Sequence, residues 1–345
     1  MTNDKVKSGA AILSVKGEAG DAAIAGRIRT RVDAAGSIAI TGHERPDGDC
    51  IGSEAALCAI LRALGKRAWI VNSDPTPPRY RHLENGEAIR VHADGETLGA
   101  DLVFVLDSTD LTRIGRIKRA DFGAAKVIDI DHHPGNPLFG DENFVDTRAA
   151  AAAELIYRLA VELNWPVPPS ALEALYTGLV ADTGHFAYSN TSSRVLRMAA
   201  ELIDLGVDGE AVWQKMYLRK THAELLLEAR ARASLECHAG GKICCISLRQ
   251  SDFDETHTSS QNADEFSGIP RSLEGVELAV FFYEVKNGAA TKVSLRSTKN
   301  IDAGKLANVF GGGGHRQAAG CTLDLPLDEA KSRFLNEAVK RMTNV

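Results

Sequence analysis

The sequence predicts an α/β protein in which a doubly wound, mostly parallel sheet is joined by a helical connector to a smaller α/β domain. The first half alternates short apolar runs with amphipathic segments, which is the rhythm of βαβ units. From about residue 190 helical periodicity dominates, and strand-like runs return near residue 240. A chain of 345 residues is also long for one hydrophobic core, so two domains are expected.

The elements of the first half follow in order along the chain. A helix is expected at 20–36, ending on Gly36, and a second at 53–66, with Ser53 as its N-cap and Gly65 beyond its end. Further helices are expected at 149–164 and 170–184. The apolar runs between them are typical of parallel strands buried on both faces, and they lie at 37–42, 67–72, 101–107 and 126–131.

The second half begins with helical segments at 192–217 and 220–236, the first interrupted by Gly206 and Gly209. A strand is expected at 242–248, and Asn287-Gly288 is the turn signal of a β-hairpin. The predicted organisation is a tail, a first domain, a helical connector and a second domain, with boundaries at 1–24, 25–195, 196–235 and 236–345.

Composition narrows the class of protein. The net charge of −6 argues against sequence-blind binding to long nucleic acid, which usually needs a basic excess. The chain has neither an apolar run near the roughly 20 residues that span a membrane nor a signal peptide, so no membrane partner and a cytoplasmic location are expected. The six cysteines lack C-x-x-C spacing and are expected to be buried free thiols.

Acidic and histidine side chains follow several predicted strands and one helix. A single Asp after a strand is usually a turn or cap residue, and a single His is usually structural. Here, however, the carboxyl ends of parallel strands meet at one edge of a sheet, so the set is expected to converge: His43, Asp47 and Asp49; Asp107; Asp131, His132 and His133; and Asp182.

Converging carboxylates repel one another unless a cation compensates them. Carboxylate oxygens alone suit Mg²⁺ or Ca²⁺, and the added imidazoles shift the preference towards Mn²⁺, Fe²⁺, Co²⁺ or Zn²⁺. The number of side chains suffices for two ions bridged by one carboxylate, a common arrangement for attack on phosphorus. The spacing His43-x-x-x-Asp47-x-Asp49 lets one extended loop serve both ions, since alternate positions face opposite ways.

The second domain contains a glycine-rich segment, FGGGGHRQAAG at 310–320. Glycines let backbone N–H groups approach an anion closely. His315 and Arg316 follow at the expected start of a short helix, whose N-terminus favours phosphate. Arg296 on the preceding strand is expected to reach the same point. A flexible turn with surface charge is the alternative interpretation.

Together these motifs resemble the DHH phosphoesterases that carry a C-terminal DHHA1 domain. The resemblance rests on HERPDGDCIGS, VLDSTDLTRIG, IDHHPGNPLFGDENFVDTRAAAAAE, YTGLVADTGHFAYSNT and VSLRSTKNIDAGKLANVFGGGGHRQAAG, and covers about residues 25–325. Within the family the chain is similar to the NanoRNase/pAp-phosphatase type. It has neither the extra domains of RecJ-type exonucleases nor the membrane helices of cyclic-dinucleotide phosphodiesterases, and its glycine-rich segment differs from the second domain of the related pyrophosphatases.

The resemblance implies two divalent ions, Mn²⁺ above all, with Mg²⁺ or Co²⁺ as alternatives. One ion would be held by His43 and Asp47, the other by Asp49, His132 and Asp182, and Asp107 would bridge them. Asp131 would orient the neighbouring ligand His132, and His133 would contact the scissile phosphate. The substrate-binding residues implied on the second domain are Arg296, Gly312, Gly313, Gly314, His315 and Arg316.

The implied activity is hydrolysis of RNA of two to five nucleotides to mononucleotides, of pAp to AMP, or of both. A cyclic or linear dinucleotide phosphodiesterase is the alternative, and a non-enzymatic nucleotide sensor is disfavoured by the full ligand set. The expected partner is thus a very short single-stranded RNA or a nucleotide, and a homodimer is compatible with the sequence.

Overall fold

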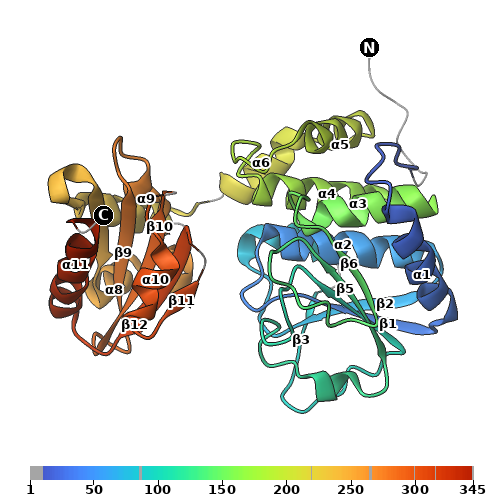
Figure 1. The fold of residues 1–345 in the computed structure, drawn as a ribbon, viewed down its shortest axis with the longest axis horizontal. Coiled ribbons are helices and arrows are strands. Elements are labelled where there is room, and N and C mark those ends of the chain that lie inside the picture. Colours follow the sequence, from blue (N-terminus) through green and yellow to red (C-terminus); the bar gives the residue numbers. More distant parts are fainter. Residues whose placement is uncertain are drawn as a thin grey trace. The chain divides into compact units, whose positions relative to one another are not determined.

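The computed structural model describes residues 11–84, 88–218, 220–263, 266–298, 300–314 and 316–343. The chain forms two compact units, Met1–Arg219 and Lys220–Val345, each built around its own sheet (Figure 1). The predicted α/β class is confirmed, with a parallel sheet in the first unit and a mixed sheet in the second.

The first unit contains a six-stranded sheet in the order β3-β2-β1-β4-β5-β6, and every pairing in it is parallel. The central strands are apolar because both of their faces are covered. The bounds are β1 Ser37–Thr41, β2 Arg67–Asn72, β3 Arg90–Val91, β4 Leu102–Leu106, β5 Lys126–Asp131 and β6 Glu142–Val145. The sequence did not predict β3 and β6, which are the two edge strands.

Six helices lie over one face of this sheet in the described residues: the first three contact its strands, and the next three pack on those helices or on one another (Figure 1). They are α1 Asp21–Ala34, α2 Gly48–Ala63, α3 Ala152–Leu163, α4 Pro169–Asp182, α5 Ser193–Asp204 and α6 Gly209–Tyr217. The other face is covered largely by the irregular segment before and after β4, through Leu98, Ile114 and Phe122. Side chains alternate along β5, so that Ile128 and Ile130 point to the helices and Val127 points to the irregular segment.

The start of α2 differs from the prediction. The helix begins at Gly48, and its N-cap is Asp47, whose carboxylate accepts hydrogen bonds from the backbone N–H groups of Asp49 and Cys50. Ser53 lies inside the helix and donates from Oγ to Asp49 Oδ1 at 3.1 Å. Aspartate is as good a cap as serine, and its earlier position places Asp49 in the first helical turn instead of an extended loop.

The second unit has a six-stranded sheet in the order β11-β12-β10-β9-β8-β7. Only β8 and β9 are parallel within it, and β9 and β10 form the predicted hairpin around Asn287-Gly288. The strands are β7 Glu236–His238, β8 Ile243–Leu248, β9 Leu278–Val285, β10 Ala290–Ser297, β11 Gly313–Gly314 and β12 Ala318–Leu323.

Helices pack on both faces of the second sheet. Phe334 and Leu306 belong to the core on one face, and Leu227, Phe253 and Phe281 to the core on the other. The helices are α7 His222–Ala233, α8 Gln250–Thr256, α9 Gly268–Arg271, α10 Ala303–Asn308 and α11 Leu327–Thr343. Of the segment predicted as a connector, α5 and α6 belong to the first unit and α7 to the second.

The cysteines depart in one respect from the expectation of six free thiols. Cys237 on β7 and Cys244 on β8 are directly opposite in the ladder and form a disulfide. Cross-strand neighbours bring their Cβ atoms within about 4.5–5.5 Å, which single-sequence spacing does not reveal. The other four, Cys50, Cys58, Cys245 and Cys321, are buried free thiols.

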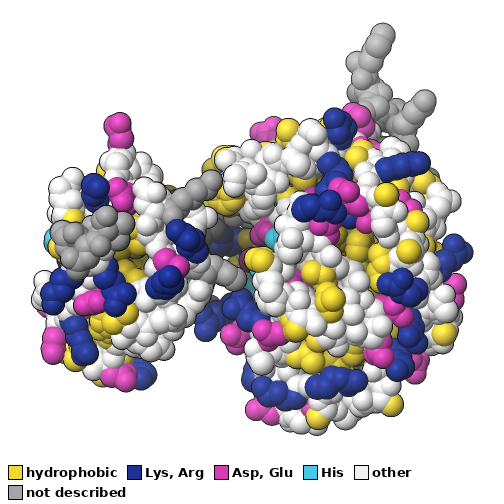
Figure 2. All heavy atoms as spheres, in the orientation of Figure 1, with side chains coloured by type: hydrophobic (Ala, Val, Ile, Leu, Met, Phe, Trp, Pro, Cys, Tyr) yellow, Lys and Arg dark blue, Asp and Glu magenta, His cyan; other side chains and the backbone are white. Residues whose placement is uncertain are grey.

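The face drawn in Figure 2 shows no single dominant charge. Basic and acidic side chains are interspersed there, in keeping with the modest net charge of −6. None of the helices in the described part of the chain combines the length and apolar character needed to cross a bilayer.

Candidate metal centre

The candidate site lies where the strand order of the first sheet reverses direction. From β1 the chain proceeds outward to β2 and β3, and it then returns to β4 on the other side of β1. The carboxyl ends beside such a reversal are the usual ligand-binding position of open α/β sheets. His43 follows β1, Asp107 follows β4, and His132 follows β5, so the predicted convergence is present.

The turn after β1 is tightly packed. A Cβ atom on Gly42 would lie 2.3 Å from Cys50 Sγ and 2.8 Å from Glu54 Oε1, so only glycine fits there. His43 Nδ1 donates to the carbonyl of Glu44 at 2.8 Å, and this fixes the ring with Nε2 facing inward. Nε2 lies 3.4 Å from Asp107 Oδ2 and 3.8 Å from Asp47 Oδ1.

Asp49 is held by a helix from a distant part of the sequence. Its carboxylate accepts from the backbone N–H groups of Ala152, at 2.5 Å, and Ala153, at 2.9 Å. Ala151, the N-cap of α3, provides no side-chain acceptor of its own. Asp49 therefore supplies the missing cap and gains from the positive end of the α3 dipole. The small residues of the alanine run allow this close approach.

Asp182 ends α4, as the sequence predicted. The helix can pass close to α2 because Gly178 faces it, where a Cβ would lie 2.9 Å from Asp49 Oδ1 and 2.6 Å from the Ala153 methyl group. This close contact brings Asp182 Oδ2 to 3.2 Å from His132 Nε2. Three elements separated in sequence thus meet around His132.

Asp107 stands between the two histidines. Its Oδ2 atom faces His43, and its Oδ1 atom lies 3.3 Å from His132 Nε2. The residue is 2% exposed, and its φ of 53° lies in the left-handed region, which costs free energy and is concentrated at functional sites. A hydrogen bond from its backbone N–H to the Ile130 carbonyl holds this conformation.

The carboxylates and imidazoles perturb one another strongly. Burial would lower the pKa of both histidines, but the adjacent Asp107, with Asp47 for His43, raises it to about 11 for His43 and about 10 for His132. For Asp107, burial acts upwards, but its two histidine partners hold its pKa well below the usual range. Burial, reinforced by neighbouring carboxylates, raises the pKa of Asp49 and Asp182. Asp49 and Asp182 therefore need further positive charge nearby to remain ionised.

The arrangement fits divalent cations. Within the described residues, Asp107 Oδ1 and His132 Nε2 are buried and have no hydrogen-bond partner, which is costly for polar atoms unless a ligand binds them. Among the described residues, His43, Cys50 and Asp107 form one group of convergent ligand atoms, and Asp49, His132 and Asp182 form another. A third group, Asp107, His132 and His133, links the two. Asp47, 54% exposed at its side chain, lies at the open rim.

The structure corrects the expected role of Asp131. Its carboxylate accepts from His133 Nδ1 at 2.8 Å and from the His133 backbone N–H at 3.2 Å, whereas His132 turns its Nδ1 to the Ala149 carbonyl. Alternate residues of an extended segment share a face, so Asp131 orients His133 and not His132. His133 Nδ1 also lies 3.6 Å from Asp107 Oδ1.

Two neighbours of the site escaped the sequence analysis. Cys50 places its thiol beside His43 and Asp107, and its position directly after Asp49 was the available signal. Asn136 donates from Nδ2 to Asp131 Oδ2 at 2.9 Å, and the sequence DHHPGN contains it only as an apparent turn residue. Together with His133 it gives both oxygens of the Asp131 carboxylate a hydrogen-bond donor.

On the second unit, Arg296 lies on β10 as predicted. The helix expected at His315-Arg316 is wrong, because β12 follows and pairs with both β10 and β11. His315 itself lies outside the described residues, and Arg316 is exposed. The ladder, which pairs Arg296 with Ala318, keeps Arg296 near the backbone of this segment.

The glycines of this segment differ in function. A Cβ on Gly312 or Gly314 would lie 2.6 Å or less from backbone atoms of β12, whereas one on Gly313 would meet only Asn308 Oδ1 at 3.8 Å. Gly312 and Gly314 are thus explained by close strand packing. The space around Gly313, on the edge strand β11, leaves its backbone accessible.

The fold and the sequence together define the class of protein. The sequence model described as DHH family, N-terminal domain, matches residues 37–179, and that of the DHHA1 domain matches residues 240–344. The chain therefore belongs to the DHH family of phosphoesterases, as the motifs indicated.

Among known proteins, the chain is similar to the bifunctional oligoribonuclease and PAP phosphatase NrnA of Thermus thermophilus. The two are 35% identical over 311 residues, which span 89% of this chain and 91% of the relative. An exopolyphosphatase-related protein from Bacteroides fragilis has the same fold, with a TM-score of 0.87 at 24% identity over 92% of this chain and 96% of that one. RecJ of Thermus thermophilus, solved in complex with Mn²⁺, gives a TM-score of 0.50 at 17% identity, over 96% of this chain and 56% of that one.

Proposed function

We propose that this phosphoesterase uses two divalent cations, Mn²⁺ in the first place, to hydrolyse RNA of two to five nucleotides to mononucleotides and pAp to AMP. The observation that carries the proposal is the position of Asp107, whose two carboxylate oxygens face two separate sets of ligand atoms. Support for the substrates comes from the 35% identity to the Thermus oligoribonuclease and PAP phosphatase.

In this proposal the six predicted ligands divide between two cations. His43 and Asp47 would hold one cation, Asp49, His132 and Asp182 would hold the other, and Asp107, which lies between the two sets, would serve both. When bound, such cations supply positive charge for the phosphoryl oxygens and make water more acidic. Mn²⁺ suits a mixed carboxylate and imidazole set, and the similar RecJ fold was solved with that ion.

The side chains around the centre prepare it for a phosphate. His133, whose Nδ1 is held by Asp131, keeps 32% of its side chain exposed. With both ring nitrogens protonated, its Nε2 would donate to a phosphoryl oxygen or pass a proton to the leaving oxygen. The Asp131 carboxylate fixes Nδ1 as the proton-bearing nitrogen that faces it, since a carboxylate only accepts.

On the second unit, we assign binding of the substrate's phosphates to Arg296 and Arg316 and to backbone N–H groups of the glycine segment. The guanidinium group matches phosphate by paired donors, and Gly313 has the space for backbone contact. His315, outside the described residues, completes the predicted set. Gly312 and Gly314 shape the strand on which this contact depends.

The test is a substrate panel with purified protein: pAp, RNA of two to seven nucleotides, and cyclic di-AMP with its linear product pApA, each with Mn²⁺ and with Mg²⁺. We expect the highest kcat/KM with Mn²⁺, on pAp or on RNA of two to five nucleotides. A preference for cyclic di-AMP or pApA over pAp and mixed-sequence dinucleotides would replace this proposal by a dinucleotide phosphodiesterase. Nucleotide binding without turnover of any substrate would indicate a sensor.

A further inference from the structure

A second cluster of potential metal ligands lies entirely within the second unit. Glu236 and His238 on β7 and Cys245 on β8 present a carboxylate oxygen, an imidazole nitrogen and a thiol whose ligand atoms all lie within 4.8 Å of one another. Neither the predicted phosphoesterase site nor the proposed substrate contacts use any of these residues.

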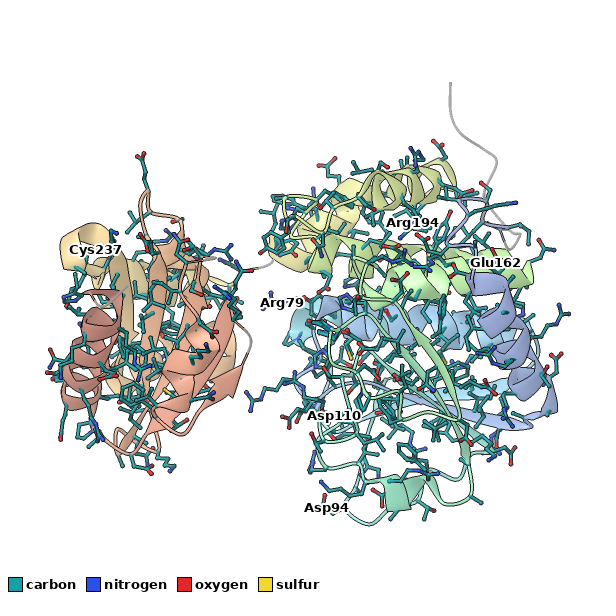
Figure 3. All side chains as sticks on the ribbon, viewed as in Figure 1. Arg79, Asp94, Asp110, Glu162, Arg194 and Cys237 are labelled. Atoms are coloured by element: carbon teal, nitrogen blue, oxygen red, sulfur yellow. A yellow bond between two sulfur atoms is a disulfide. The ribbon has the colours of Figure 1, made fainter. Side chains whose placement is uncertain are left out.

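The backbone fixes this juxtaposition. Glu236 and His238 are two residues apart on β7 and therefore share a face, and Cys245 is the direct cross-strand partner of Glu236. The disulfide between Cys237 and Cys244, next to it in the ladder, closes the same pair of strands through the opposite face. Cys237 is labelled in Figure 3. The three ligands are thus carried by a short, cross-linked strand pair.

The distances are close to those of a tetrahedral site. Cys245 Sγ lies 3.9 Å from His238 Nε2, and that nitrogen lies 3.8 Å from Glu236 Oε2. Zinc bonds of about 2.0–2.3 Å at tetrahedral angles separate neighbouring ligands by about 3.3–3.6 Å. Side-chain movements of a few tenths of an ångström would therefore bring both of these pairs to zinc-ligand distances, and all three ligand atoms already lie within 4.8 Å of one another.

The surroundings of the cluster suit a cation with a sulfur ligand. Cys245 is buried, whereas the side chains of Glu236 and His238 are 51% and 35% exposed, so an ion has access from solvent. Lys331 Nζ binds Glu236 Oε1 at 2.6 Å and leaves Oε2 facing His238. A hydrogen bond to the second oxygen is how proteins commonly orient a carboxylate ligand.

We propose that Glu236, His238 and Cys245 form a binding site for one thiophilic divalent cation, Zn²⁺ being the best match. Thiolate, imidazole and carboxylate are the three zinc ligands of proteins, and three of them leave a fourth position for water. Burial raises the pKa of the Cys245 thiol to about 11, against the opposing effect of Lys331, so binding displaces the thiol proton. The cation would tie the edge strand β7 to β8 independently of the disulfide.

The experiment uses the full chain, kept non-reduced and with the Cys237–Cys244 disulfide verified by peptide mass mapping. Co²⁺ is titrated as a probe, because a cobalt–thiolate bond gives a charge-transfer absorption that nitrogen and oxygen ligands do not. Zn²⁺ is then added to displace it. Cys50, the thiol near the phosphoesterase site, is replaced in the matched control Cys50→Ser.

We expect the charge-transfer band to saturate with one of the bound Co²⁺ equivalents, and we expect added Zn²⁺ to remove it. The band should disappear in Cys245→Ser. In His238→Gln the apparent affinity for Co²⁺ should fall at least tenfold, and because His238 is partly exposed this substitution should leave the fold intact. The band should persist in Cys50→Ser, in Asp107→Asn and in the exposed-histidine control His222→Gln. A band that is absent from the unmodified chain, survives Cys245→Ser or disappears with Cys50→Ser would overturn the proposal.

Discussion

Replacing Asp131 by Asn tests how His133 is held. The buried carboxylate accepts three hydrogen bonds, two from His133 and one from Asn136 Nδ2. Asparagine keeps the shape of the side chain but loses the charge and one acceptor oxygen. A hydrogen bond to a charged group contributes roughly 1.5–3 kcal/mol, so loss of the ionic partner should lower kcat by roughly 10- to 150-fold.

The assay measures kcat for pAp hydrolysis at saturating Mn²⁺, together with the Mn²⁺ bound per chain by elemental analysis. Because His132 turns to Ala149 and not to Asp131, metal content should not change. Asp101→Asn is the matched control, since Asp101 also accepts three hydrogen bonds, from Gly36 and Ser37, far from the carboxyl ends of the strands. Loss of bound Mn²⁺ in Asp131→Asn, or an unchanged kcat, would refute the assignment.

Three further predictions concern stability. Gly42→Ala forces a Cβ to within 2.3 Å of Cys50 Sγ and should cost about 1–3 kcal/mol of unfolding free energy while weakening Mn²⁺ binding. Gly26→Ala, in open space on α1, should instead gain about 0.5–1 kcal/mol in the same denaturant titration. Burial raises the pKa of Glu54 from 4.5 to about 8, so the folded state holds a proton that the unfolded chain has lost, and stability falls as pH rises between these values. Glu54→Gln should remove that slope, which amounts to about 1.4 kcal/mol of unfolding free energy per pH unit. Parallel curves of unfolding free energy against pH for the two proteins would contradict this prediction. Arg158→Met leaves buried Asp21 without its guanidinium partner, which binds it at 2.6 and 2.7 Å, and should cost about 3–5 kcal/mol by thermal or urea unfolding.

The parts of the site that follow local rules could be predicted from the sequence. An Asp or His directly after a buried apolar run must lie at the carboxyl end of a strand, so His43, Asp107 and His132 were placed correctly at one edge. Asp182 followed from the end of a helical pattern. The helices α3 and α4 and the β9–β10 hairpin could also be predicted, since helical periodicity and the Asn-Gly turn are local signals.

What the sequence could not reveal depends on contacts between distant segments. Asp49 caps α3 through residues more than 100 positions away, and no local pattern encodes that bond. The role expected of Asp131 came from the family resemblance, whereas its actual partner, His133, follows from the alternation of side chains along an extended segment. The small residues from Ala318 onward form the strand β12 because β10 and β11 supply pairing partners for it, although the same residues would also fit a helix.

Mn²⁺ binding and pAp hydrolysis by Asp107→Asn test the central claim most directly, because this carboxylate alone faces both sets of ligand atoms. Asp110→Asn, on the same loop and labelled in Figure 3, is the matched control. The unmodified chain and the control should each bind two Mn²⁺ and turn over pAp. Asp107→Asn should bind at most one Mn²⁺ tightly and lose at least about a thousandfold in kcat, a barrier increase of about 4 kcal/mol. Two tightly bound Mn²⁺ ions with undiminished turnover in Asp107→Asn would contradict the account.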